Sequence, residues 1–333
     1  MAPPPQLHEP VILTGIGTDA VNSFEDLSGL CSNRTSPKPE FDNPYDTLIE
    51  ACDNVPAQIQ KAYQTHRITR NANQRDRLLA PEFPGVTIDY ILQELEYTRG
   101  SSVVKYAFPD DAPTRSEAEI DPRNCLVFWA RPTMLVMDLI QRIQLRLKDL
   151  APNLWLMPRE NLHLTVLEIT HSTTPEYVEM LVDRMRTALG TIVNHPRTHR
   201  ARLVKPLLSF DAAALAVSFV PASGRDGDEY TYHHLRRDFY KMSKGANVGV
   251  TSRYIVPSAH ITIARFVTSK DHETNGVVDP SKMKKWMERV WEINEEIADW
   301  DGEWIVGGER GLDCRSGRLW YGGGQTVVKA EGF

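Results

Sequence analysis

Two apolar stretches of the chain each carry a histidine and a threonine two positions apart. They read NLHLTVLEI, residues 161–169, and AHITIARF, residues 259–266. Successive side chains of a β-strand point to opposite faces, so a strand over either stretch has one polar and one aliphatic face. Because the aliphatic face needs a covering layer, both stretches predict sheets that are packed against helices on one side.

On the first predicted strand, simple alternation places His163 and Thr165 on one face. Leu164 then points to the opposite face, toward the covering layer. Continued to the end of the stretch, the same alternation puts Leu167 on the histidine face and Glu168 on the aliphatic face. We therefore expect His163 and Thr165 to form the polar part of this strand.

The second predicted strand has the same arrangement, with His260 and Thr262 on one face. Ile261 and its aliphatic neighbours occupy the other face. Simple alternation also assigns Arg265 to the face of Ile261, away from the histidine. A bend in the strand is needed to bring Arg265 to the polar face.

The histidine–x–threonine spacing also occurs at His171 and His272, in polar segments that we expect to be loops. A single histidine in an apolar strand is most often a core residue hydrogen-bonded to a neighbour. Two matched strands favour a shared site formed by His163 and His260. A zinc site needs a third protein ligand, and no HExxH or acidic cluster accompanies them, so no metal is expected. His233 and His234, adjacent on a predicted helix, are expected at the surface.

The order strand, helix, histidine strand, capped helix occurs twice between residue 124 and the end of the chain. Thr174 followed by Pro175 is a typical helix start, and Asp279 followed by Pro280 repeats it. The alternation of helices with short strands predicts the α+β class. The predicted strands cover 124–130, 154–158, 214–220, 303–314 and 318–324, with a turn at Ser316–Gly317, and the predicted helices cover 134–150, 174–189, 229–242 and a segment from residue 280.

The first 120 residues are predicted to be an extension of unknown function, mainly helical where it is ordered. Helices are expected over 45–52, 56–80 and 86–97, the last with Ile88 and Leu92 on one face. A polar, proline-bearing segment at 109–123 then favours a boundary between the extension, 1–120, and a second domain, 121–333.

The charge of the chain argues against a large nucleic-acid interface. There are 38 basic and 44 acidic residues, a net charge of −6, whereas extended nucleic-acid interfaces are strongly basic. The four cysteines form no CxxC pair, which fits a reducing compartment. No stretch approaches 18 apolar residues and no secretory leader is evident. We expect a cytoplasmic or nuclear protein that does not enter a membrane.

The two histidine strands resemble the motifs of the two-histidine (2H) phosphoesterases. That family carries two tetrapeptides of the form His-hydrophobic-Thr/Ser-hydrophobic, matched here by HLTV at 163–166 and HITI at 260–263. The resemblance covers about 124–330. It implies a bilobal α+β fold in which two antiparallel sheets, with helices outside them, face a central groove. It also implies activity on 2′,3′-cyclic phosphates, on the related ADP-ribose cyclic phosphate, or on RNA-end phosphodiesters, without a metal or other cofactor.

This chemistry suits the residue types. One histidine near its usual pKa of about 6.5 can act as base and the other as acid in a phosphodiester displacement. The hydroxyls of Thr165 and Thr262 are expected to donate to phosphate oxygens. Arg265 is a further candidate for phosphate, and Tyr254 for stacking on a base. The alternatives are a module that binds a nucleotide or RNA end without turnover, and the same histidines serving chemistry without phosphate.

Overall fold

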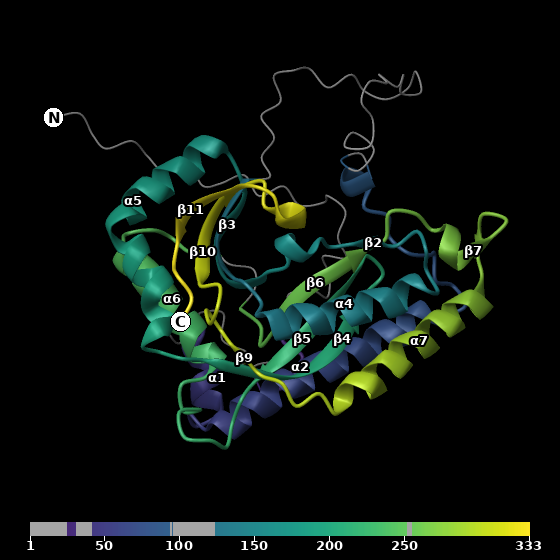
Figure 1. Cartoon of the computed structure of the whole chain (residues 1–333), viewed down its shortest axis with the longest axis horizontal. Coiled ribbons are helices and arrows are strands. Elements are labelled where there is room, and N and C mark those ends of the chain that lie inside the picture. The colour runs from purple at the N-terminus through teal and green to yellow at the C-terminus, as the bar shows by residue number, and fades with distance from the viewer. Residues whose placement is uncertain (1–24, 31–41, 94, 96–123, 252–254) are drawn as a thin grey trace.

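Two antiparallel β-sheets and the helices packed on them make up the structure (Figure 1). It is a computed structural model, and it describes residues 25–30, 42–93, 95, 124–251 and 255–333. Strands and helices are interspersed along the chain. The predicted α+β class is confirmed.

The first sheet has four strands in the order β11-β10-β1-β3, and each neighbouring pair is antiparallel. The first histidine motif is at its β3 edge. The strand β3 begins at Leu164, so His163 lies immediately before it rather than inside it. The strands of this sheet are β1 (Asn124–Ala130), β3 (Leu164–Thr173), β10 (Leu312–Gly317) and β11 (Gln325–Lys329).

The second sheet has five strands in the order β2-β6-β5-β4-β9, also antiparallel throughout. The second histidine motif lies on β6, next to the short edge strand β2. The strands are β2 (Trp155–Leu156), β4 (Arg202–Phe210), β5 (Ala214–Pro221), β6 (Ala259–Arg265) and β9 (Trp304–Ile305). A separate hairpin pairs β7 (Glu273–Thr274) with β8 (Val277–Val278).

The two sheets take their strands alternately from the sequence. β2 lies between β1 and β3 in the chain but belongs to the second sheet, and β9 joins the second sheet just before β10 and β11 complete the first. The predicted turn at Ser316–Gly317 is wrong, because both residues are part of β10. The turn is formed instead by residues 318–324, which were predicted to be a strand.

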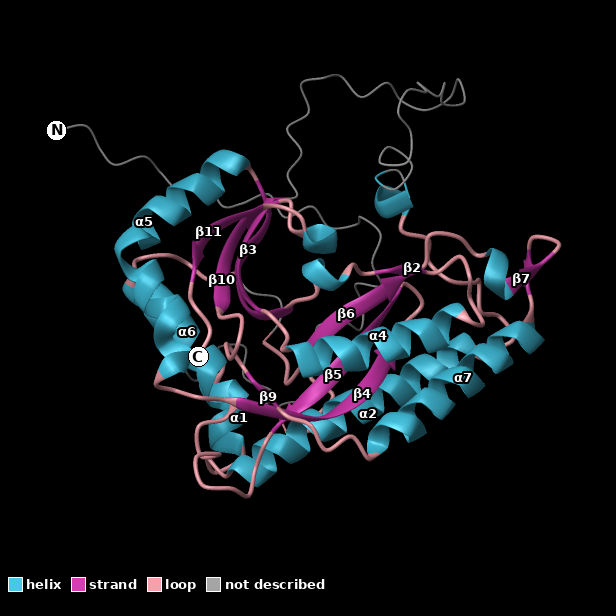
Figure 2. Cartoon of the chain, in the orientation of Figure 1, coloured by secondary structure: helices cyan, strands magenta, loops and turns pink. Residues whose placement is uncertain are grey.

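Helices cover each sheet on its apolar face. Figure 2 shows α5 and α6 beside the first sheet, and α4 and α7 beside the second. The predicted helix starts are confirmed: the Thr174 side chain accepts from the Tyr177 N–H, and the Asp279 side chain accepts from the Ser281 and Lys282 N–H groups. The helices are α1 (Asp46–Ala51), α2 (Pro56–Leu78), α4 (Met134–Lys148), α5 (Pro175–Asn194), α6 (Tyr232–Gly245) and α7 (Pro280–Ala298).

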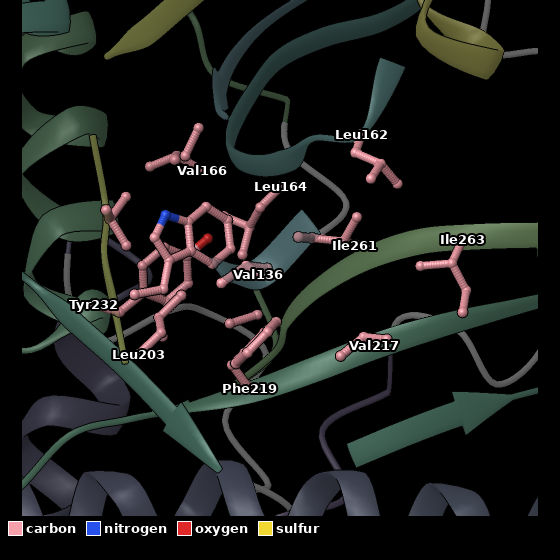
Figure 3. Packing of buried hydrophobic residues seen from close by; sticks show 14 of the residues in the cluster. Val136, Leu162, Leu164, Val166, Leu203, Val217, Phe219, Tyr232, Ile261 and Ile263 are labelled. Carbon is pink, nitrogen blue, oxygen red and sulfur yellow. The ribbon is translucent and has the colours of Figure 1, made fainter. Parts of the chain in front are cut away.

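The aliphatic faces of both histidine strands pack into one hydrophobic core. Leu164 and Val166 from β3 lie in the same cluster as Ile261 and Ile263 from β6, and Val136 of α4 packs with them (Figure 3). All five side chains are almost completely buried. This shared core is the reason why β3 and β6 contact each other although they belong to different sheets.

The helix α2 packs on strands β4 and β5 of the second sheet. Its Arg67 donates to the carbonyl oxygens of Lys205 and Ser218, and its Asn71 donates to that of Leu208. Apolar residues of α2, among them Tyr63, belong to the main core. The helices α1 and α2 are thus observed in this segment, with α2 in direct contact with the sheet, while a mainly helical extension and a domain boundary near residue 120 stay predictions.

The helix predicted over 86–97 begins later than expected, at Tyr90. The Thr87 N–H donates to the Ala212 carbonyl and the Asp89 N–H to the Phe266 carbonyl, which hold 86–89 extended along the second sheet. Ile88 is therefore not helical, so it does not share a helical face with Leu92 as predicted. Asp89 instead caps the short helix by accepting from the Leu92 N–H.

Several histidines outside the motif pair are buried, among them His233 and His234, which were predicted to lie at the surface. His233 and His234 lie inside α6, where His233 donates from Nε2 to the Tyr45 carbonyl and accepts at Nδ1 from the Tyr63 hydroxyl. His171 is part of β3, and His272 lies in a short turn against Trp286. Polar flanking sequence suggested loops, but strand pairing and aromatic packing decide the burial.

In the described ranges, no helix combines the length and the apolar character needed to cross a membrane.

Candidate functional site

A β-bulge in β3 changes which residues share a face with His163. Trp129 of β1 pairs with Thr165, but the next residue of β1, Phe128, pairs with Leu167, so Val166 is an extra residue in β3. From that point the alternation is reversed. Leu167 joins the hydrophobic core, and simple alternation was wrong in placing it beside His163.

The same bulge places Glu168 on the polar face. Glu168 pairs with Val127, which lies on the Trp129 face of β1 in a cluster separate from the main core. Directly paired residues project from the same face of a sheet. The prediction that Glu168 lies on the aliphatic face is therefore wrong.

A second bulge lies at the equivalent place in β6. Thr262 pairs with Ala216 of β5, but Ala264 pairs with the neighbouring Leu215, so Ile263 is the extra residue. Arg265, which pairs with Ala214, consequently projects from the face of Thr262. Simple alternation had placed Arg265 on the opposite face, and the bulge supplies the bend that was needed.

The two histidine strands therefore match in more than sequence. In each, the bulged residue (Val166 or Ile263) is the third after the histidine and is fully buried. Each strand then returns one charged residue to the polar face, Glu168 in β3 and Arg265 in β6. The matched bulges give both strands the same local shape but opposite charge at equivalent positions.

His163 stacks on an indole ring and has a defined tautomer. Its ring lies 3.7 Å from that of Trp129, centroid to centroid, with 20° between the planes. Its Nδ1 lies 2.7 Å from the carbonyl oxygen of Asn161. A carbonyl only accepts, so Nδ1 carries the proton and Nε2 carries the lone pair. Burial lowers the pKa of His163 to about 3, the Asn161 hydrogen bond opposes this, and Arg131 adds to it.

His260 is held in a similar way by a residue two positions earlier. Its Nδ1 lies 2.9 Å from the hydroxyl oxygen of Ser258. The pKa of His260 is lowered to about 4, chiefly by burial and also by the charges of Arg70 and Arg236. Asp211 acts in the opposite direction. Because Arg70 belongs to α2 and forms an ion pair with Asp211, the N-terminal helix contributes charges beside His260.

The two predicted histidines lie near one another. The charge on His260 contributes to the lowered pKa of His163, and the strands β3 and β6 that carry the two motifs are in contact. Both residues are partly exposed, although burial dominates the surroundings of their rings. At neutral pH both imidazoles are uncharged in the protein alone.

Thr165 and Thr262 project from the same faces as the histidines. Both are partly exposed. Within the part of the chain that the structure describes, neither hydroxyl forms a hydrogen bond, whereas buried hydroxyls are normally satisfied. Each hydroxyl is thus able to donate to a ligand placed beside the histidines.

Two arginines and an aspartate that sequence reasoning missed surround the Trp129 ring. The guanidinium carbons of Arg131 and Arg315 each lie 5.1 Å from its centroid. Arg131 forms a 2.7 Å ion pair with Asp313, while Arg315 has no ion-pair partner among the described residues and donates to the carbonyls of the turn at 323–324. Alternation along 124–131 places Arg131 in phase with Trp129, whereas Arg315 and Asp313 reach the same face only through the pairing of β1 with β10.

Arg265, on the His260 side, is already engaged by an acidic residue of the N-terminal segment. Its Nη1 lies 3.2 Å from Asp89, and its guanidinium carbon lies 5.6 Å from the Tyr321 ring centroid. The Tyr321 hydroxyl donates to the same Asp89 over 2.5 Å. The remaining predicted site residue, Tyr254, lies outside the described residues.

No group of three or more histidine, cysteine, aspartate or glutamate side chains arranged to hold a metal ion occurs in the described ranges.

Comparison with known proteins gives little similarity. No protein-family model matches the chain, and no curated protein matches it in sequence. Among solved structures, a conserved protein of unknown function from Agrobacterium tumefaciens str. C58 is similar with a TM-score of 0.42 and 16% identity, over 71% of this chain and 98% of that one. The function is therefore inferred from the residues of this chain.

Proposed function

We propose that the chain is a phosphodiesterase of the 2H type, which hydrolyses a cyclic phosphate by acid–base catalysis from His163 and His260. The supporting observation is the pair of contacting strands with matched His-x-Thr faces and matched bulges. A bilobal arrangement with a central groove belongs to the same proposal. The substrate class is a 2′,3′-cyclic nucleotide or a similar RNA end.

His163 suits the role of base. Its Nδ1 proton is fixed on the Asn161 carbonyl, so Nε2 is available to take a proton from the attacking water. Arg131 and Arg315 oppose a positive charge on the ring before reaction. Water attacks phosphorus, its proton passes to His163, and the bond from phosphorus to the leaving ribose oxygen breaks.

His260 then suits the role of acid, giving its proton to the leaving oxygen. Its pKa of about 4 in the protein alone leaves it neutral at pH 7. A bound phosphate anion favours the charged imidazolium and raises this pKa toward neutrality. Asp211 favours protonation of His260 as well, and no carboxylate has a similar effect on His163 among the causes of its shift. This difference supports His260 as the acid.

The neighbouring polar groups complement a phosphate that becomes more negative in the transition state. Thr165 and Thr262 offer hydroxyl donors from the two sides. Arg131 and Arg315 lie close enough together for Arg131 to lower the pKa of Arg315. Arg131 is ion-paired with Asp313, whereas Arg315 donates to neutral groups among the described residues, so an anion is able to pair with the Arg315 guanidinium.

The test is an assay of 2′,3′-cyclic nucleotides in EDTA. Wild type, His163→Ala and His260→Ala are compared with His199→Ala, a control that removes an exposed histidine. The proposal expects hydrolysis by wild type and the control, and a loss of at least a thousandfold in kcat for either motif variant. Equal activity in all four proteins contradicts the proposal.

A binding module that holds a nucleotide or RNA end without turnover is the second candidate. It is favoured by one observation: both motif histidines are neutral near pH 7, so the protein alone has no charged acid in place. Titration calorimetry with a nucleoside 2′-monophosphate distinguishes the two. Tight binding that survives loss of both histidines, with no hydrolysis of any cyclic nucleotide, supports the module.

A further inference from the structure

A chain of contacts connects the backbone beside His163 to Arg265 on the other histidine strand. The Asn161 carbonyl holds Nδ1 of His163, and the Asn161 side chain donates to the Tyr321 carbonyl over 3.0 Å. The Tyr321 hydroxyl donates to Asp89, which is ion-paired with Arg265. Tyr321, in the turn between β10 and β11, is thus the only residue in this chain of contacts that connects to both Asn161 and Asp89.

Tyr321 has an unusual backbone conformation for a large side chain. Its φ of 63° and ψ of 21° lie in the left-handed region, where residues other than glycine and asparagine are uncommon. Such conformations persist where the surroundings fix them, and they concentrate at functional sites. The side chain is 8% exposed and packs edge-on against Trp155. The surrounding structure therefore holds Tyr321 tightly.

The next residue presses the turn onto the same asparagine. A Cβ atom added to Gly322 would lie 2.4 Å from the Asn161 Cβ, closer than two carbon atoms approach without bonding. Gly322 also has a φ of 84°, so both space and conformation require glycine. The turn thus contacts Asn161 through a hydrogen bond and through close packing.

We infer that Tyr321 and Asp89 form a clasp that positions His163 and Arg265 relative to each other for the reaction. The inference rests on the proposed function. Tyr321 fixes Asn161, whose carbonyl orients the His163 ring, and with Asp89 it fixes the guanidinium of Arg265. Neither residue needs to touch the phosphate, so both are positioning residues.

The clasp also gives the N-terminal segment a role. Asp89 comes from the stretch that hydrogen-bonds to Ala212 and Phe266 at the end of the second sheet. Its carboxylate is held by three donors, from Tyr321, Arg265 and the Leu92 backbone. The segment before residue 120 is therefore required to complete a site whose histidines both lie after it.

The principal test removes the tyrosine hydroxyl with Tyr321→Phe. The matched control is Tyr230→Phe, because Tyr230 also donates its hydroxyl to an aspartate, Asp238, on α6. We expect Tyr321→Phe to lower kcat on a 2′,3′-cyclic nucleotide at least tenfold with less than a threefold change in KM. The control should change kcat less than twofold, although its melting temperature should fall by about as much as that of Tyr321→Phe.

A double-mutant cycle separates a clasp from two unrelated contacts. Asn161→Ala removes the other end of the connection, and Tyr321→Phe combined with it should lose much less activity than the product of the single losses. Losses that multiply, or Tyr321→Phe activity within twofold of wild type, overturn the inference.

A readout without turnover keeps the clasp testable if the enzyme proposal fails. In wild type, ¹⁵N chemical shifts of His163 should show the tautomer protonated at Nδ1, as its contact with Asn161 requires. In Asn161→Ala and Tyr321→Phe we expect a shift toward a mixture of the two tautomers, and in Tyr230→Phe none. Absence of hydrolysis by wild type rejects the proposed function, whereas an unchanged tautomer in both variants rejects the clasp.

Discussion

Acidification from pH 7 to pH 5 should destabilise the protein through its buried histidines, and the two motif histidines should account for a measurable part of the loss. Each is neutral in the folded state, with a pKa lowered to about 3 for His163 and about 4 for His260, chiefly by burial. In the unfolded chain a histidine has a pKa near 6.5. Below that pH the unfolded state binds more protons, so stability falls as the pH decreases.

The size of the effect follows from these pKa values. At pH 5 a histidine with a folded pKa of about 4 and an unfolded pKa of about 6.5 lowers the free energy of unfolding by about 2 kcal/mol relative to pH 7. The two motif histidines together should therefore cost about 4 kcal/mol, a large share of the 5–15 kcal/mol that typically stabilises a domain. Other buried histidines with lowered pKa values add to the total: His66, His233, His234 and His272.

Urea unfolding at pH 7, 6 and 5 measures this directly. His163→Asn and His260→Asn each remove one titrating ring, so each variant should lose about 2 kcal/mol less than wild type between pH 7 and pH 5. Carboxylates with lowered pKa values, such as Asp238, stabilise the protein until the pH falls below about 4. They therefore do not contribute to the change in stability between pH 7 and pH 5. His199→Asn, at an exposed position, is the control.

Equal pH dependence in wild type and both motif variants would refute the reasoning. Added phosphate offers a second check. An anion bound between the histidines raises their folded pKa values, so it should reduce the acid sensitivity of wild type. It should leave the acid sensitivity of the double variant, His163→Asn with His260→Asn, unchanged.

Three further outcomes are expected. Arg315→Gln should weaken binding of a nucleoside 2′-monophosphate about tenfold in calorimetry, because a charge-assisted hydrogen bond is worth about 1.5–3 kcal/mol; an unchanged affinity would place the anion elsewhere. Thr174→Ala should lower the free energy of unfolding in urea by about 1 kcal/mol, because the N-cap of α5 is lost, whereas Thr174→Ser should retain most of this stability. Trp286→Ala should cost about 3–5 kcal/mol, since this α7 side chain is almost fully buried against Phe266 and His272, and a cost below 1 kcal/mol would contradict that packing.

Local sequence signals predicted the starts of two helices well. The starts of α5 and α7 were visible as Thr174–Pro175 and Asp279–Pro280, because capping depends on residues within one turn of each other. That Thr165 shares a face with His163, and Thr262 with His260, was also predictable locally. Side-chain alternation over two residues of a strand is enough to place them.

The bulges were not predictable from alternation, because Val166 and Ile263 are apolar residues inside apolar runs. A bulge is defined by the partner strand, and nothing in HLTVLEI or HITIAR shows where Phe128 or Leu215 will pair. The faces of Glu168 and Arg265 were consequently assigned wrongly. The same non-local pairing hid Arg315, which joins the site only because β10 lies beside β1.

The alternating origin of the strands has a consequence for how the chain folds. Neither sheet is a continuous segment: the first needs residues 124–130 and 312–329 side by side, and the second needs residues 155–156 beside β6 and 304–305 beside β4. Contacts so far apart in sequence slow folding. During synthesis, β1 and β3 must wait for the last strands to emerge, with the edge of β1 unpaired. A chain that ends before Leu312 should therefore keep the edge of β1 unpaired and aggregate through that open edge.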